Sequence, residues 1–152
     1  MKKEILFVCT GNTCRSPMAE VLCKRMLIEQ NMDNDYSCSS AGVYAFEGDN
    51  ASYEAASVVK QDGLDISNHY ARILSYDIVK DAYIIFTMTE NHKRMVLDVY
   101  SEARDKVFTL KEFAQYSKYD KDITDPFGMG EEAYAACIRE IKTVLLKILD
   151  RL

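Results

Sequence analysis

The chain has 152 residues and a formal net charge of -5, and 48% of its residues are hydrophobic and 28% charged. This length suits a single domain over 1–152 with one core, and the composition excludes an intrinsically disordered chain. The acidic balance without any basic run argues against a nucleic-acid partner, and no apolar run approaches the roughly 18–20 residues of a membrane span.

Segments typical of strands and helices alternate along the chain. Buried strands are predicted at EILFVC (4–9), YSCSSAGV (36–43), AYIIFTM (82–88) and DKVFTL (105–110). Helices are predicted from a Ser16 cap with Pro17 at the first position to about Gln30, over 50–63, over 89–100 behind Thr89, and from about Glu131. The alternation predicts an α/β, Rossmann-like fold: a four-stranded parallel sheet with helices on both faces.

The loop VCTGNTCRSP (8–17) leads from the first strand into the first helix, at the sheet edge where such folds bind ligands. Its consecutive backbone N–H groups and the helix N-terminus suit an anion. Gly11 leaves room for the anion to approach, Asn12 tolerates a left-handed backbone, and the Arg15 guanidinium matches two phosphate oxygens. Cys9 lies at the bottom of this cradle, where its thiolate is a candidate nucleophile for phosphoryl transfer.

The cysteines also have plainer interpretations. A lone cysteine at a strand end is usually a small core residue, and Cys23, Cys38 and Cys137 are interpreted in that way. Cys9 and Cys14 lack the second pair of ligands that a zinc site needs, so no metal is predicted. The five cysteines match no secreted disulfide pattern, and the N-terminus does not resemble a signal peptide; a cytoplasmic protein is therefore expected.

A phosphatase also needs an acid that protonates the leaving group, and TDPFGMG (124–130) offers the best candidate. Pro126 stiffens the backbone after Asp125, and Phe127 is placed to form a wall of the pocket. An Asp-Pro pair by itself is more often only a turn. Asp120 and Asp122 are nearby alternatives in a charged, solvated stretch.

The stretch VCTGNTCRSPMAE (8–20) closely resembles the signature of the low-molecular-weight protein phosphatases, and SSAG (39–42), SNHYAR (67–72) and DPF (125–127) are similar to further segments of that family. The resemblance implies a mechanism without a cofactor, in which Cys9 forms a cysteinyl-phosphate. Asp125 protonates the leaving group and then activates water, while Arg15 stabilises the transition state. The implied phosphate-binding residues are Thr10, Gly11, Asn12, Thr13, Cys14, Arg15 and Ser16.

The same resemblance implies a supporting role for several polar residues. Ser16 donates a hydrogen bond to the departing thiolate, and Ser16, Ser40 and His69 hold the unusual backbone at Asn12. An isolated histidine is more often structural than catalytic, which agrees with a supporting role for His69. His92 is expected to be an exposed helix residue, and a position at the rim of the pocket is the less favoured alternative.

Details within the family favour phosphoarginine as the substrate. Arsenate reductases rely on further cysteines in the middle of the chain, and none lies between Cys38 and Cys137. Phosphotyrosine enzymes usually carry a larger aliphatic residue in place of Thr13 and often a tyrosine in place of Phe127. MTENHKRMV (88–96) and RDKVFTLKEF (104–113) look most like the bacterial protein-arginine phosphatases. The sequence therefore favours a protein-arginine phosphatase acting on phosphorylated proteins.

Two other functions stay open, as does the oligomeric state. The first is a low-molecular-weight protein-tyrosine phosphatase, and the second is a phosphoprotein-binding module without catalysis. A redox hypothesis concerns Cys14, which is expected close to Cys9. It would capture oxidised Cys9 as a reversible disulfide, unless it only packs against the loop. A search for the Cys9–Cys14 peptide in a peroxide-treated sample tests this hypothesis.

Overall fold

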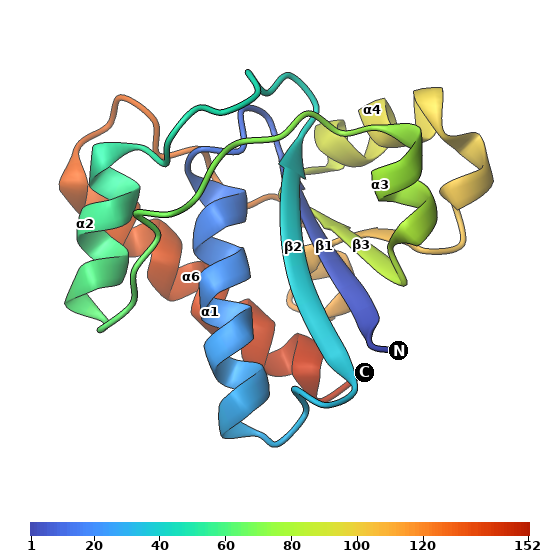
Figure 1. Ribbon diagram of the computed structural model, residues 1–152, viewed down its shortest axis with the longest axis horizontal. Coiled ribbons are helices and arrows are strands. Elements are labelled where there is room, and N and C mark those ends of the chain that lie inside the picture. The colour runs from blue at the N-terminus through green and yellow to red at the C-terminus, as the bar shows by residue number, and fades with distance from the viewer.

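Four parallel strands form one sheet in the order β2-β1-β3-β4 (Figure 1). The computed structural model describes residues 1–152. The strands are β1 (Lys3–Cys9), β2 (Tyr36–Gly42), β3 (Ile84–Thr87) and β4 (Val107–Thr109). The predicted four-stranded parallel sheet is confirmed, and β1 lies between β2 and β3, so that Cys9 ends an interior strand.

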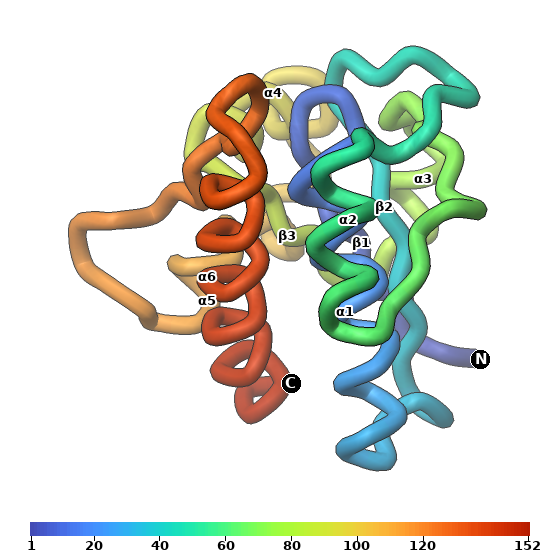
Figure 2. Tube along the Cα trace, turned by 90° about the vertical axis from the view of Figure 1, so that its left-hand side faces the viewer, coloured from blue at the N-terminus to red at the C-terminus, as the bar shows by residue number.

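Helices cover both faces of the sheet, as the sequence predicted (Figures 1 and 2). On one face lie α1 (Arg15–Glu29), α2 (Tyr53–Gln61), α5 (Leu110–Phe113) and α6 (Glu131–Leu149). On the other face lie α3 (Tyr76–Asp81), α4 (Glu90–Val99) and a 3-10 helix (Ser101–Ala103). None of these helices combines the length and the apolar character that a bilayer crossing requires.

Alternate residues of β1 serve two separate hydrophobic cores. Ile5 and Phe7 pack with α1, α2 and α6, whereas Leu6 and Val8 pack with α3 and α4. Because successive side chains of a strand point to opposite faces, a strand covered on both sides must be apolar throughout. This requirement explains the unbroken apolar run that identified β1 in the sequence.

The first helix begins differently from the prediction. Cys14, not Ser16, is the N-cap residue, and no side chain caps the helix. Arg15 is the first helical residue, so Pro17 occupies the third position instead of the first. Ser16 is fully buried, and its hydroxyl forms a hydrogen bond with the thiol of Cys9. The prediction of a Ser16 cap was therefore wrong, because this hydroxyl is directed into the site.

The sequence missed two short helices, α3 and α5, which have six and four residues. Elements this short show too little periodicity to be recognised. Their caps did carry a signal, because Ser75 caps α3, and Thr109 and Glu112 form a reciprocal capping box at α5. The predicted Thr89 cap of α4 and the start of α6 at Glu131 are confirmed.

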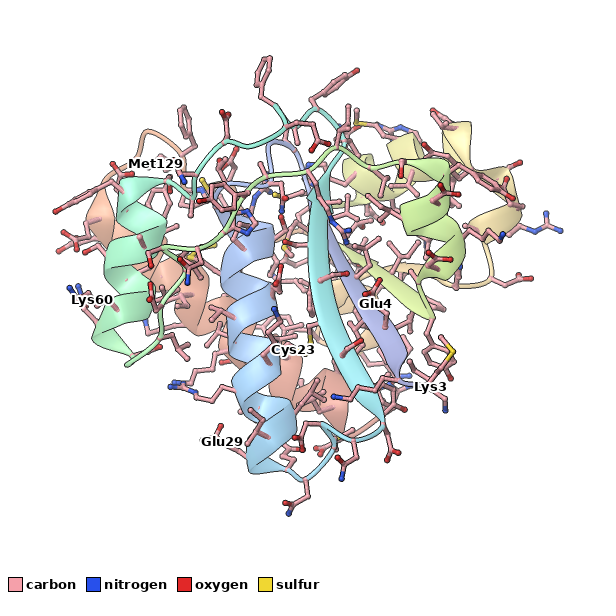
Figure 3. All side chains as sticks on the ribbon, in the orientation of Figure 1. Lys3, Glu4, Cys23, Glu29, Lys60 and Met129 are labelled. Carbon is pink, nitrogen blue, oxygen red and sulfur yellow. The ribbon has the colours of Figure 1, made fainter.

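The carboxyl ends of the strands define the functional edge of the molecule. In Figure 3, Lys3 and Glu29 lie at one end of the molecule and Met129 lies at the other. The loop after β1 and the segment before α6 meet at the end marked by Met129, while the chain between α5 and α6 extends outward before it returns there (Figure 2). Two loops far apart in the sequence thus come together beside Cys9.

Candidate active site

The loop at residues 10–14 is built as an anion cradle. The backbone N–H groups of these five residues donate to no protein acceptor. The carbonyl oxygens of Cys9, Thr10 and Thr13 instead accept hydrogen bonds from Val43, Tyr44 and Ser52, at 3.0, 2.9 and 2.8 Å. The carbonyl groups are therefore tied to neighbouring segments, and the positive ends of the peptide dipoles remain for a bound anion.

Glycine is required at Gly42, which faces this loop from the end of β2. A Cβ atom there would lie 2.4 Å from the Thr10 carbonyl oxygen and 3.0 Å from the Asn12 nitrogen. At Gly11 an added Cβ would meet only the Thr13 hydroxyl, at an ordinary 3.7 Å. The protein itself therefore tolerates a side chain at Gly11, and the close backbone contact that shapes the loop is at Gly42.

A cavity of about 240 Å³ lies over the loop and brings the predicted residues together. It is lined by Cys9, Thr10, Gly11, Thr13, Cys14, Arg15, Asp125 and Phe127. Arg15 is buried, and its Nη1 donates to the carbonyl oxygen of Ile123 at 2.9 Å. Its Nη2 lies 3.6 Å from Oδ2 of Asp125, whose side chain is 53% exposed. The cavity therefore joins a thiol, a guanidinium and a carboxyl group that solvent and substrate can reach.

A chain of hydrogen bonds leads from Glu20 to Cys9. The Glu20 carboxylate only accepts, so the Ser40 hydroxyl donates to it over 2.6 Å. The Asn12 amide nitrogen donates to both Ser40, at 2.9 Å, and Ser16, at 2.8 Å. The Ser16 hydroxyl, which accepts from Asn12, has its own proton to donate to the Cys9 sulfur, 2.9 Å away. This order of donors places a hydrogen-bond donor on the sulfur, which stabilises a thiolate.

The backbone at Asn12 is held in the left-handed region, with φ of 58°. His69 Nε2 lies 2.7 Å from the Asn12 carbonyl oxygen, and the Arg72 N–H donates to the Asn12 side-chain oxygen at 3.0 Å. The structure thus brings Ser16, Ser40 and His69 together around Asn12. Glu20 and Arg72 were missed, although both lie in the quoted stretches 8–20 and 67–72.

Asp120 and Asp122, the alternatives to Asp125, are engaged elsewhere. Asp120 accepts from the buried Lys111 ammonium at 2.6 Å, which lowers the pKa of the Asp120 carboxyl below its usual value. Asp122 accepts the Glu90 N–H at 2.8 Å, at the start of α4. Asp125 alone among the three lines the cavity. The geometry therefore favours Asp125 as the acid.

His92 is buried, so the expectation of an exposed helix residue was wrong. Only 4% of its surface is exposed, and its Nε2 lies 2.8 Å from the Thr10 hydroxyl oxygen. The first turn of α4 packs directly on the loop, which no periodicity within the helix reveals. Burial and the nearby Arg15 guanidinium lower the pKa of His92 from 6.5 to about 4.

We expect the free energy of unfolding to fall as the pH is lowered from 6.5 to about 4. The unfolded chain binds a proton at His92 near pH 6.5, whereas the folded chain resists that proton down to about pH 4. The stabilisation is complete above pH 6.5, and about 3 kcal/mol is lost across this window. Urea unfolding at several pH values measures the slope. A slope that is the same in His92→Gln would contradict this origin.

The other cysteines lie where the sequence placed them. Cys23, Cys38 and Cys137 are buried core residues, as predicted, and all five thiols are free. The Cys14 sulfur lies 3.2 Å from the Tyr134 hydroxyl. Because the Cys9 and Cys14 thiols are both free, the disulfide between them stays a prediction. No group of three or more His, Cys, Asp or Glu side chains is arranged to hold a metal ion.

Known proteins resemble this chain over nearly its whole length. The family model described as low molecular weight phosphotyrosine protein phosphatase matches residues 4–152. A protein-arginine-phosphatase of Geobacillus stearothermophilus is 41% identical over 152 residues, covering 100% of this chain and 97% of the relative. The crystal structure of a low molecular weight protein tyrosine phosphatase from T. tengcongensis matches with a TM-score of 0.92 and 40% identity, over 99% of this chain and 100% of that one. A YwlE arginine phosphatase mutant with a phosphorylated active-site serine matches with a TM-score of 0.92 and 33% identity, over 98% of this chain and 95% of that one.

Proposed function

The chain belongs to the low molecular weight phosphotyrosine protein phosphatase family and is a cysteine-based protein phosphatase, and from this premise we propose that it hydrolyses phosphoarginine on proteins. The main support for arginine is the 41% identity, over the whole chain, with a relative named protein-arginine-phosphatase. Thr13 in the cavity wall adds a hydroxyl where a larger aliphatic side chain was expected for phosphotyrosine enzymes.

In the proposed first step, the Cys9 sulfur attacks phosphorus and the bond from phosphorus to the leaving nitrogen breaks. Asp125 gives its proton to that nitrogen, so the phosphorylated guanidinium group leaves as the ordinary, positively charged guanidinium of arginine. The free N–H groups of residues 10–14 and the Arg15 guanidinium bind the phosphoryl oxygens. The products are a cysteinyl-phosphate, an unmodified arginine and an ionised Asp125.

In the proposed second step, water attacks the cysteinyl-phosphate and gives a proton to Asp125. The sulfur–phosphorus bond breaks, inorganic phosphate leaves, and the Ser16 hydroxyl stabilises the departing thiolate from 2.9 Å. The relative with a phosphorylated active-site serine supports a covalent intermediate on the nucleophile. Each residue then returns to its starting protonation state.

The cavity also suits an arginine leaving group on electrostatic grounds. Arginine regains its positive charge as it leaves, and the ionised Asp125 faces the same cavity. Phe127 forms part of the wall and is 72% exposed, so it offers an aromatic face at the entrance for stacking on a planar guanidinium. A carboxylate beside the leaving group favours this cation over a phenol.

The deciding measurement compares kcat/KM on a phosphoarginine-containing protein with kcat/KM on a phosphotyrosine peptide, with Cys9→Ser as the blank. We expect a strong preference for phosphoarginine. A preference for phosphotyrosine would show that this chain is a protein-tyrosine phosphatase, like the T. tengcongensis relative by its name. The proposed mechanism would be unchanged. No turnover of either substrate or of an aryl phosphate would leave a phosphoprotein-binding module.

Thr13→Ile is expected to shift the ratio of the two kcat/KM values toward phosphotyrosine by about tenfold. The substitution removes one hydroxyl from the cavity wall and adds apolar surface, and a single hydrogen bond contributes on the order of 1 kcal/mol. Thr13→Val keeps the branched shape and separates the hydroxyl from the added bulk. An unchanged ratio in both variants would remove Thr13 from the account of specificity.

The partners that we propose are phosphorylated proteins, and the cytoplasm is the proposed place of action. Free thiols at all five cysteines support a reducing compartment.

A further inference from the structure

The first turn of α4 is attached to both loops that form the cavity. On one side, His92 Nε2 lies 2.8 Å from the Thr10 hydroxyl oxygen. On the other side, the Glu90 N–H donates to Asp122 at 2.8 Å, and the Met88 carbonyl accepts from Ile123 at 2.8 Å. The start of α4 therefore fixes two segments relative to each other: the loop at residues 10–14, called the phosphate loop here, and residues 122–127, called the acid loop. The hydrogen bond between His92 and Thr10 is the only one that a side chain of α4 makes to the phosphate loop.

The surroundings of His92 require a neutral imidazole. Its Nδ1 is buried and has no hydrogen-bond partner, so a second N–H at this atom would have no acceptor. The charged groups that face it are Arg15 from α1 and Asp122 and Asp125 from the acid loop. Arg15 opposes a second positive charge here.

The neutral imidazole has one proton, and burial decides which nitrogen holds it. A proton on Nδ1 would be a buried donor without an acceptor, which is unfavourable. A proton on Nε2 is donated to the Thr10 hydroxyl oxygen instead. Thr10 lines the cavity, and its own hydroxyl proton is then free for a bound molecule.

We propose that His92 is a positioning residue that acts through Thr10. It holds the Thr10 hydroxyl in the cavity wall beside Cys9, with the hydroxyl proton available to a bound phosphoryl group. This inference deepens the proposed function, because it rests on the cavity binding and hydrolysing a phosphoryl compound. It adds a residue from α4 to a cavity whose lining comes from the end of β1, the loop after it, the first residue of α1 and the segment before α6.

The test compares His92→Leu, His92→Gln, Thr10→Val and the double variant His92→Leu/Thr10→Val. Leucine fills much of the space but makes no hydrogen bond, whereas the glutamine amide nitrogen can replace imidazole Nε2. We expect His92→Leu and Thr10→Val each to lower kcat/KM by about tenfold, the change that loss of one hydrogen bond produces. The double variant should fall no further than either single variant, and His92→Gln should retain most of the activity.

Two further measurements separate positioning from simple stability. Calorimetry on each variant gives the dissociation constant of inorganic phosphate, which should rise in His92→Leu and recover in His92→Gln. Thermal unfolding gives the stability of each variant. A His92→Leu variant that melts at a lower temperature but keeps its kcat/KM and its phosphate affinity would overturn the proposal, as would losses that add in the double variant.

The activity assays use both an aryl phosphate and a phosphoarginine protein. If the unmodified enzyme hydrolyses only the aryl phosphate, the proposed substrate is wrong, and the comparison of the His92 variants is made on the aryl phosphate. If it hydrolyses neither, the phosphate dissociation constants of the same variants decide whether His92 positions Thr10.

Discussion

Replacing Cys9 by serine is expected to lower kcat/KM by more than about 10⁴-fold on every substrate that the enzyme hydrolyses. The side chain lies at the bottom of the cavity, among N–H groups that donate to nothing else in the protein. A hydroxyl in the same place is a much weaker nucleophile, because a hydroxyl holds its proton far more tightly than a thiol does. The volume changes little, so the fold should persist. Steady-state kinetics and circular dichroism measure the two effects.

The control for this substitution is Cys38→Ala. Cys38 is also a buried, free thiol, but it lies within β2 and does not line the cavity. We expect some loss of thermal stability and little change in kcat/KM. Activity that persists in Cys9→Ser but disappears in Cys38→Ala would place the reactive sulfur elsewhere. Mass spectrometry of Cys9→Ser after incubation with substrate should find a trapped phosphoryl group at position 9, like the one on the active-site serine of the YwlE arginine phosphatase mutant.

The sequence predicted those parts of the site that are contiguous along the chain. The loop between β1 and α1 joins an apolar strand to a helix within a few residues, so the geometry of its N–H groups follows from local structure. Asp125 was predicted because Pro126 marks a stiff turn and because a phosphatase needs an acid. The loop and Asp125 were thus both predicted from local signals, and for Asp125 a chemical requirement was added.

The residues that were missed act across long separations. His92 meets Thr10 over 82 positions of sequence, and its burial depends on how α4 packs against the loop. The burial of Lys111 depends on Asp120 and on Glu140 in α6. Spacing within one helix shows which face is apolar, but it does not show which polar side chain will meet a partner from another element. These contacts became visible only with the arrangement of the elements.

Asp125→Asn is expected to lower kcat/KM on a phosphoarginine protein by about 10²- to 10⁴-fold. Arginine holds its proton up to a pH above about 12, so the leaving nitrogen must be protonated as its bond to phosphorus breaks. Asparagine keeps the shape of the side chain, which lies 3.6 Å from Arg15, but it has no proton to give. An aryl phosphate such as para-nitrophenyl phosphate releases a stable anion, so formation of the cysteinyl-phosphate from it should be slowed far less. Rapid-mixing kinetics on the two substrates measure that step directly.

The matched control for Asp125→Asn is Asp122→Asn. Asp122 uses one carboxylate oxygen to accept the Glu90 N–H, and the asparagine oxygen can accept the same hydrogen bond. We expect its kcat/KM to change by less than about threefold, because one neutral hydrogen bond replaces a charge-assisted one. The two aspartates differ in what they face: one lines the cavity, and the other accepts the N–H of Glu90, the first residue of α4. Equal losses in both variants, or a loss at Asp125 that is the same for good and poor leaving groups, would show that the acid loop only shapes the cavity and that the proton comes from another donor.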